Sequence, residues 1–153
     1  MKKSRVLALA LAAVVVALPV AAQQQFGKAE DAIHYRQGAF TLLGQHFGSL
    51  GAMANGKAPF DATKAAFDAE VIALASKLPF GAFADGSDKG RTGAKPEIWK
   101  EQAKFVDLRD KMQAEVAKVA AAAKSGNLDN LKATFGSAAQ SCKACHDNYR
   151  QRL

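Results

Sequence analysis

Residues 127–150, NLDNLKATFGSAAQSCKACHDNYR, are the stretch from which the fold can be predicted. Apolar side chains recur along it at alternating steps of three and four residues: Leu128, Leu131, Phe135, Ala138, Cys142, Cys145 and Tyr149. That spacing predicts an α-helix with one apolar face, of the kind that packs in a helix bundle. Asn127 is a suitable N-cap because its side-chain oxygen can accept a hydrogen bond from the first turn.

The same helix contains Cys142-Lys143-Ala144-Cys145-His146, a C-x-x-C-H motif. This motif is the attachment site of a c-type haem. The two thiols add across the vinyl groups of a porphyrin, and the adjacent histidine can bind the iron. On a helix these three residues share one face, so that face supplies both covalent anchors and the axial ligand. The chain has no other Cys, so we expect one haem c per chain.

Three other interpretations of the motif are possible. A thioredoxin-like redox C-x-x-C follows a strand in a βαβ unit, whereas a helical pattern precedes this one. A zinc site needs further Cys or His residues at ligand spacing, and His34 and His46 form no such pair. The motif could also arise by chance, but an export signal at the other end of the chain favours the haem interpretation.

The N-terminal segment has the pattern of a secretory signal peptide. Three basic residues within positions 2–5 precede an uncharged apolar run over 6–18, and small residues at 20–22 suit cleavage. The run is too short to span a membrane, although a retained anchor is the alternative. We therefore expect residues 1–22 to be removed on export, which places the mature chain, 23–153, in the periplasm if the source is a Gram-negative bacterium.

The mature chain has the length and charge of one ordinary soluble domain. The signal holds three of the 21 basic residues and none of the 14 acidic ones, so the mature net charge is +4. No basic stripe with interleaved aromatic residues occurs, so we expect no nucleic-acid partner. No other apolar run could span a membrane, so we expect no membrane partner. An acidic redox partner is compatible with the charge and is not implied by it.

Three further helices are predicted before the last one. The first covers about residues 28–50. The second begins after the N-cap Asp61 and ends at Pro79, and the third begins at Pro96 and ends near Gly126. Together with the C-terminal helix they predict an all-α, antiparallel four-helix bundle in which the haem lies near the C-terminal helix.

Each of these helices has an expected apolar face. The three faces are Ile33, Phe40, Leu43, Phe47 and Leu50; Phe67, Val71, Leu74 and Leu78; and Ile98, Phe105, Leu108, Met112, Val116, Val119 and Ala123. The segments 51–60 and 79–95 are expected to be loops. Gly38, Gly44 and Gly48 weaken the first helix by about 1 kcal/mol each relative to Ala. Either a close helix–helix contact or simple tolerance explains them.

Several segments together resemble a known family, cytochrome c′, the class II c-type cytochromes. They are the residues around Tyr35-Arg36-Gln37, Ala58-Pro59-Phe60-Asp61 and Pro96-Glu97-Ile98-Trp99, and the stretch 139–150. The C-terminal haem motif is the most telling part, because class I cytochromes c carry theirs near the N-terminus. The resemblance covers essentially the whole mature chain, and it implies a five-coordinate iron with His146 as its one protein ligand.

The resemblance implies roles for three further residues. Phe40, four residues after Arg36, is implied as the apolar, non-ligating residue on the distal face of the haem, with plain core packing as the alternative. Arg36 is implied as a partner of a haem propionate, and Arg150 as a neighbour of the proximal face. Without the resemblance, each arginine would be an ordinary surface charge. The family is usually dimeric and symmetric dimers are the commonest oligomers, so we expect a homodimer built on the first helix.

Such a haem could bind gases, transfer electrons or catalyse a reaction, and the sequence favours the first. An apolar distal face favours binding of uncharged diatomic gases such as NO and CO, and the family is associated with NO binding. Electron transfer is the alternative and would need a Met opposite the His, but no Met occurs between residues 23 and 52. Met53 falls in the loop after the first helix, and Met112 lies on the apolar face of the third, where gap-filling in the core is the preferred interpretation. Catalysis usually needs a distal base, and His34 and His46 each lie six residues from Phe40, off its helical face, so we expect no enzyme activity.

Overall fold

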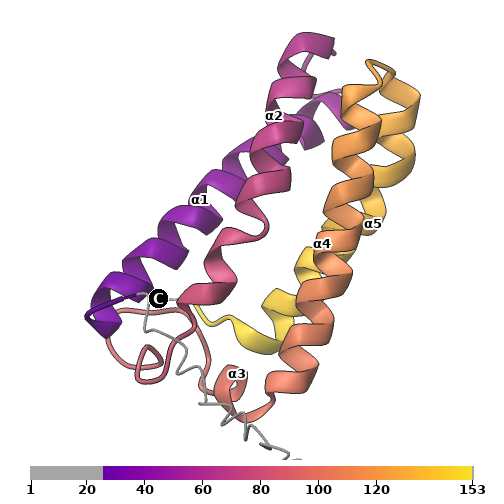
Figure 1. The fold of residues 1–153 in the computed structure, drawn as a ribbon. Coiled ribbons are helices and arrows are strands. Elements are labelled where there is room, and N and C mark those ends of the chain that lie inside the picture. Colours follow the sequence, from indigo (N-terminus) through magenta and orange to yellow (C-terminus); the bar gives the residue numbers. More distant parts are fainter. Residues whose placement is uncertain (1–25, 153) are drawn as a thin grey trace, which may run out of the picture.

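The computed structural model describes residues 26–152, so the predicted signal peptide lies outside the described residues. Four long helices are present: α1 (Ala29–Ala54), α2 (Ala62–Ala75), α4 (Gln102–Lys124) and α5 (Leu128–Tyr149). Between α2 and α4 lie the short 3-10 helix η1 (Leu78–Ala82) and the one-turn helix α3 (Glu97–Lys100). The helices α1 and α2 form one antiparallel pair and α4 and α5 the other (Figure 1). The predicted all-α four-helix bundle is confirmed.

Capping side chains set the starts of two helices where the sequence predicts them. The Asp61 carboxylate accepts a hydrogen bond of 3.0 Å from the Lys64 backbone N–H, at the start of α2. The Asn127 side chain accepts hydrogen bonds from the backbone N–H groups of Asp129 and Asn130, at 2.8 and 3.2 Å. Each cap satisfies donors that have no partner within the helix, and so defines where the helix begins.

The helix α1 continues to Ala54, which corrects the expectation of a loop from residue 51. Gly51 lies inside the helix, where a methyl group on its Cα would be 2.5 Å from Cζ of Phe135. This glycine therefore permits a close approach of α1 and α5, and is not a turn residue. By contrast, a methyl group on Gly38, Gly44 or Gly48 would meet no described atom within 4 Å.

The predicted apolar face of α2 is wrong. Phe67 and Leu74 are 59 % and 62 % exposed, whereas Ala65, Ala69 and Ile72 are fully buried. Both faces of this helix are apolar, so helical spacing alone does not distinguish them. The bundle buries the face with small side chains, because alanines allow helices to pack closely. The helix also ends at Ala75, before Pro79, which lies in η1.

The predicted third helix is interrupted at Glu101, whose φ of −115° and ψ of 42° separate α3 from α4. Buried residues of α1, α2, α4 and α5 form the main core. A smaller cluster gathers Ile98, Phe105 and Tyr149 at one end of the bundle, with Cys145 packed against it. None of the helices within residues 26–152 combines the length and the apolar character that a membrane span needs.

Candidate haem site

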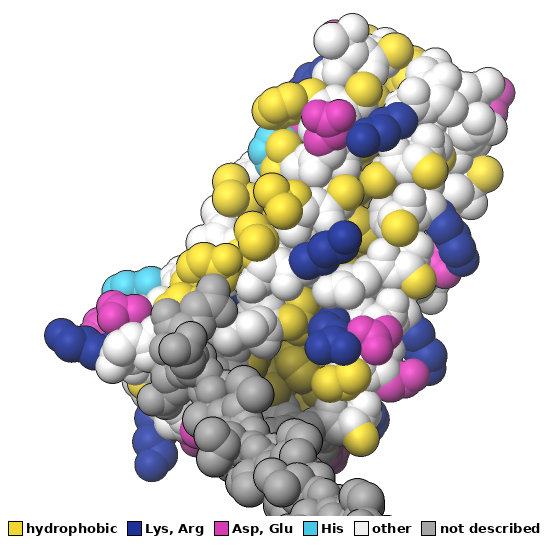
Figure 2. All heavy atoms as spheres, viewed as in Figure 1, with side chains coloured by type: hydrophobic (Ala, Val, Ile, Leu, Met, Phe, Trp, Pro, Cys, Tyr) yellow, Lys and Arg dark blue, Asp and Glu magenta, His cyan; other side chains and the backbone are white. Residues whose placement is uncertain are grey.

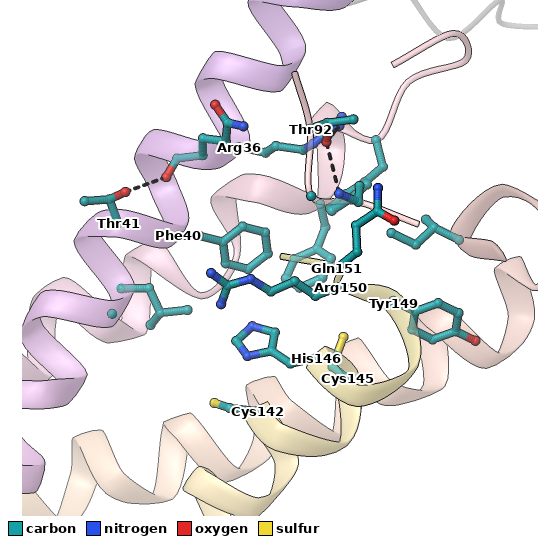
Figure 3. Close-up of a pocket in the computed structure, with 18 of the residues that line it drawn as sticks. Arg36, Phe40, Thr41, Thr92, Cys142, Cys145, His146, Tyr149, Arg150 and Gln151 are labelled. Carbon is teal, nitrogen blue, oxygen red and sulfur yellow. Dashed lines mark hydrogen bonds between the residues drawn. The ribbon is translucent and has the colours of Figure 1, made fainter. Parts of the chain in front are cut away.

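A cavity of about 1160 Å³ opens between α1, α4, α5 and the segment after η1. All six predicted site residues line it: Arg36, Phe40, Cys142, Cys145, His146 and Arg150. The cavity exceeds the roughly 300–1,000 Å³ of ordinary small-molecule pockets, so it has room for a large planar ligand. Phe40 on α1 and His146 on α5 face each other across it, and the Arg150 side chain extends into the same space (Figure 3).

The two cysteines present their sulfur atoms to the cavity from consecutive turns of α5 (Figure 3). Both are free thiols. Burial raises the pKa of Cys142, and burial together with the neighbouring Cys142 raises the pKa of Cys145 to about 11. Both side chains are therefore protonated thiols at neutral pH, and this form disfavours binding of a soft metal ion, because the thiolate is the metal ligand.

His146 lies on the same helix and also lines the cavity. Desolvation by the cavity walls lowers its pKa, the positive charge of Arg150 lowers it further, and Asp147 acts weakly in the opposite direction. The imidazole is therefore neutral at physiological pH, and a neutral imidazole nitrogen is the form that binds a metal. The site residues Cys142, Cys145 and His146 thus present two thiols and one ligating nitrogen on one helix.

The end of α5 is fastened to a distant loop. The Lys95 N–H donates to the Tyr149 carbonyl at 3.0 Å, and the Gln151 N–H donates to the Gly93 carbonyl at 2.8 Å. The buried Tyr149 hydroxyl donates to a Glu101 carboxylate oxygen at 2.9 Å, and burial together with this carboxylate raises the pKa of Tyr149 to about 12. These contacts position Arg150 beside His146, and helix spacing alone does not predict them.

The opposite side of the cavity is apolar and aromatic. The Phe40 ring packs edge-on against Phe80 and Phe83, with ring centroids 6.0 and 6.5 Å apart. Edge-to-face pairs at these separations are favourable contacts. The α1 side chain that faces His146 is the hydrocarbon ring of Phe40, which has no atom that can bind a metal (Figure 3).

Arg36 is 2 % exposed, so its alternative interpretation as a surface charge is wrong. Its Nη1 donates to the Ala82 carbonyl at 3.1 Å and to Ser87 Oγ at 2.7 Å, and its Nη2 donates to the Ser87 carbonyl at 2.6 Å and to Thr92 Oγ1 at 2.7 Å. Burial lowers its pKa, but an arginine remains protonated at neutral pH. The predicted contact with a propionate stays a prediction, for which Nε is the donor left outside these four bonds.

Three arginines that the sequence analysis missed also line the cavity: Arg91, Arg109 and Arg152. The described residues that line it include no Asp or Glu. The cavity therefore combines apolar walls, two thiols, one imidazole and an excess of positive charge, and this set fits a haem with its two carboxylate substituents. No local sequence signal marks these arginines, because they come from separate parts of the chain.

The other candidate ligands lie in different places. Met53 is in the main core and does not line the cavity, whereas Met112 of α4 lines it and is 5 % exposed. His34 lines the cavity and lies 4.0 Å from Glu30. His46 is outside the cavity, and its Nδ1 lies 2.7 Å from the buried Asp68 carboxylate.

The fold and the site together define a four-helix-bundle haem protein with its attachment motif in the last helix. The family model described as Cytochrome C′ matches residues 31–150. The chain belongs to the cytochrome c′ family, which consists of non-enzymatic haem proteins and implies a c-type haem.

Three relatives illustrate the family. Cytochrome c′ from Rubrivivax gelatinosus is 48 % identical over 129 residues, which cover 84 % of this chain and all of the relative. Cytochrome c′ from Alcaligenes xylosoxydans xylosoxydans is 44 % identical, with 84 % and 99 % covered. Cytochrome c-554 from Cereibacter sphaeroides is 35 % identical, with 95 % and 96 % covered.

Solved structures agree with these relationships. The crystal structure of the Rubrivivax gelatinosus cytochrome c′ superposes with a TM-score of 0.80 at 48 % identity and covers 83 % of this chain and all of that one. A nitric oxide complex of a mutant cytochrome c prime from Alcaligenes xylosoxidans superposes with a TM-score of 0.78 at 43 % identity, with 84 % and 100 % covered. Structural neighbours of this chain therefore include nitric oxide complexes.

Proposed function

We propose that this protein is a periplasmic haem protein that binds diatomic gases, NO and CO, at a five-coordinate iron. One haem c is held through thioethers from Cys142 and Cys145, with His146 as the axial ligand. Removal of residues 1–22 on export precedes attachment, and residues 23–153 form the bundle. Bound haem supplies the iron that receives the gas, and the chain's own residues determine what can reach it.

The observation that carries the gas-binding proposal is the contrast across the cavity. His146 offers a neutral imidazole, whereas Phe40 on the opposite side offers only a hydrocarbon ring. An apolar face without a hydrogen-bond donor favours NO and CO over the polar O₂ adduct. The nitric oxide complexes among the structural neighbours support the same class of ligand.

Visible and EPR spectra of the purified protein in both oxidation states test this proposal. We expect a high-spin, five-coordinate ferrous spectrum, and CO binding that displaces no protein ligand. A low-spin, six-coordinate ferrous spectrum contradicts the proposal.

Electron transfer is the second candidate function, and Met112 is the observation that favours it. This thioether lines the cavity, so it could serve as a ligand if its position changed. Met112→Leu distinguishes the two functions. Unchanged spectra exclude a Met112 ligand, and conversion of a low-spin spectrum to a high-spin one supports it.

We also propose that the protein is a homodimer that pairs through α1 and α2. Apolar side chains gather along the α1–α2 side of the molecule (Figure 2), where Leu42, Phe67 and Leu74 are 51 %, 59 % and 62 % exposed. Gly38 and Gly48 leave open space on α1, which would allow a second backbone to come close. Apolar side chains exposed together are typical of protein interfaces.

Light scattering at micromolar concentration tests the assembly. The native protein should have the mass of two chains, and Phe67→Glu should have the mass of one. Val106→Glu is the control, because Val106 of α4 is also an exposed apolar residue, at 38 %. A monomeric native protein, or equal dissociation of both variants, contradicts the proposed interface.

A further inference from the structure

The Phe40 ring belongs to a larger aromatic cluster. Phe80 and Phe83 lie 6.2 Å apart, between centroids, and each also packs against Phe105, at 5.8 and 4.9 Å. We call Phe80, Phe83 and Phe105 the aromatic wall. Its residues come from η1, from the position just after η1, and from α4. Phe40 therefore packs against a wall built by other segments of the chain.

Side-chain hydrogen bonds, one buried and one partly buried, hold the backbone on both sides of Phe83. The preceding carbonyl, of Ala82, accepts from Arg36 Nη1 at 3.1 Å. The following carbonyl, of Ala84, accepts from Trp99 Nε1 at 3.2 Å. The Phe83 ring itself lies 4.8 Å from the Arg36 guanidinium carbon and 6.0 Å from the Trp99 ring. A cation over a ring face and an adjacent aromatic ring both fix its position.

The other bonds of Arg36 hold the rest of the loop. Its contacts with Ser87 and Thr92 fasten residues 82–92 to α1. The next residue of α1, Gln37, donates to the Arg91 carbonyl at 3.0 Å and adds to the same attachment. Since buried hydrogen bonds to a charged group are stronger than neutral ones, this loop should be rigid although it contains little regular secondary structure.

From this arrangement we propose that Phe80 and Phe83 are specificity-determining residues, which limit how far Phe40 can move and so how large a ligand the cavity admits. Arg36 is the positioning residue that keeps Phe83 in place. The inference rests on the proposed function, in which a gas binds on the Phe40 side. A close-packed aromatic cluster resists displacement, so Phe40 can make room for a diatomic gas but not for a larger ligand of the same chemistry.

Alkyl isocyanides are suitable probes, because they bind ferrous haem as CO does and vary in length. In the holoprotein, Phe83→Leu and Phe80→Leu should each raise the ratio of n-butyl isocyanide affinity to CO affinity by about tenfold or more, the discrimination that one or two methylenes supply in an apolar pocket. The control is Phe135→Leu, since Phe135 stacks on Phe47 in the core and does not line the cavity. An equal ratio in the control and the wall variants overturns the inference.

A double variant tests whether the wall acts through Phe40. In the Phe40→Ala background, Phe83→Leu should no longer change the ratio, because the ring that the wall restrains is absent. A Phe83→Leu effect that persists undiminished overturns the inference. If Phe40→Ala alone leaves CO and isocyanide binding unchanged, the proposed distal role of Phe40 fails, so the two failures are distinguishable.

The role of Arg36 needs a readout that does not depend on ligand binding. Arg36→Lys keeps the charge but cannot make four bonds in the guanidinium geometry, so hydrogen–deuterium exchange over residues 82–92 should accelerate and the isocyanide ratio should rise. Thr92→Val removes one acceptor and should shift both quantities in the same direction by less. If either variant binds haem normally and the rate of hydrogen–deuterium exchange over residues 82–92 is unchanged, Arg36 does not position Phe83.

Discussion

The two sides of the cavity are built in different ways. The His146 side comes from one helix, α5, where Cys142, Cys145 and His146 lie within five residues. The Phe40 side comes from α1, η1, the 82–92 loop and α4, and Arg36 and Trp99 hold it together. A local motif can define the first side because helical spacing alone brings its residues together. The second side exists only in the folded chain, and the predictions below test this contrast.

The largest effect is expected on the His146 side. Replacing both Cys142 and Cys145 with Ala removes the two thioether anchors, so no haem should remain with the protein after acid-acetone extraction. Absorbance of the extracted protein measures this. Ser141→Ala is the control and should retain its haem, because this neighbour on α5 is outside the motif. Haem that stays covalently bound to the double variant contradicts the proposed attachment.

On the Phe40 side, a single substitution should lower stability and speed CO binding without removing the haem. Phe40→Ala removes a half-buried ring and should lower the free energy of unfolding by about 3 kcal/mol, near the lower end for such changes. Urea denaturation measures it. CO should also bind faster, as measured by stopped flow, because the ring opposite His146 is gone. Unchanged stability together with unchanged CO kinetics means that Phe40 does not close this side.

A pH effect should be specific to the His146 side. The folded-state pKa of Tyr149, about 12, lies above its ordinary value of about 10. Folding therefore favours the neutral phenol, and its contribution to stability is complete below about pH 10 and is lost as the pH rises towards about 12. Unfolding in urea at pH 9 and pH 11 should show a smaller loss for Tyr149→Phe than for the native protein. Equal losses contradict this assignment.

The smallest effect concerns a single side chain on the Phe40 side. Thr92→Val deprives one Arg36 N–H and the Ala94 backbone N–H of their shared acceptor and should cost about 2 kcal/mol of stability, which thermal unfolding can measure. The exposed Thr41→Val, which loses only a hydrogen bond to the Gln37 carbonyl of its own helix, should change stability less. A greater loss in the Thr41 variant contradicts the role given to the loop attachment.

Errors in the sequence-based prediction fall where packing decides between equivalent patterns. In α2 the spacing of Phe67 and Leu74 is as helical as that of Ala65 and Ile72, and only the neighbouring helices determine which face is buried. In α1, Gly51 has the appearance of a loop residue, but α5 uses its missing side chain for close contact with Phe135. Neither outcome follows from local propensity, because both depend on a partner distant in sequence.

The sequence by itself determined the helical class of the protein, the caps at Asp61 and Asn127, the packing face of α5 and the haem motif within it. These features depend on spacing within one turn or one helix, so they can be read from neighbouring residues. Only the tertiary structure decided the buried face of α2, the interruption at Glu101, the arginines around the cavity and the partners of Arg36. Arg36 donates to residues 46 to 56 positions away, and such contacts are chosen by how the helices pack and not by the local chain.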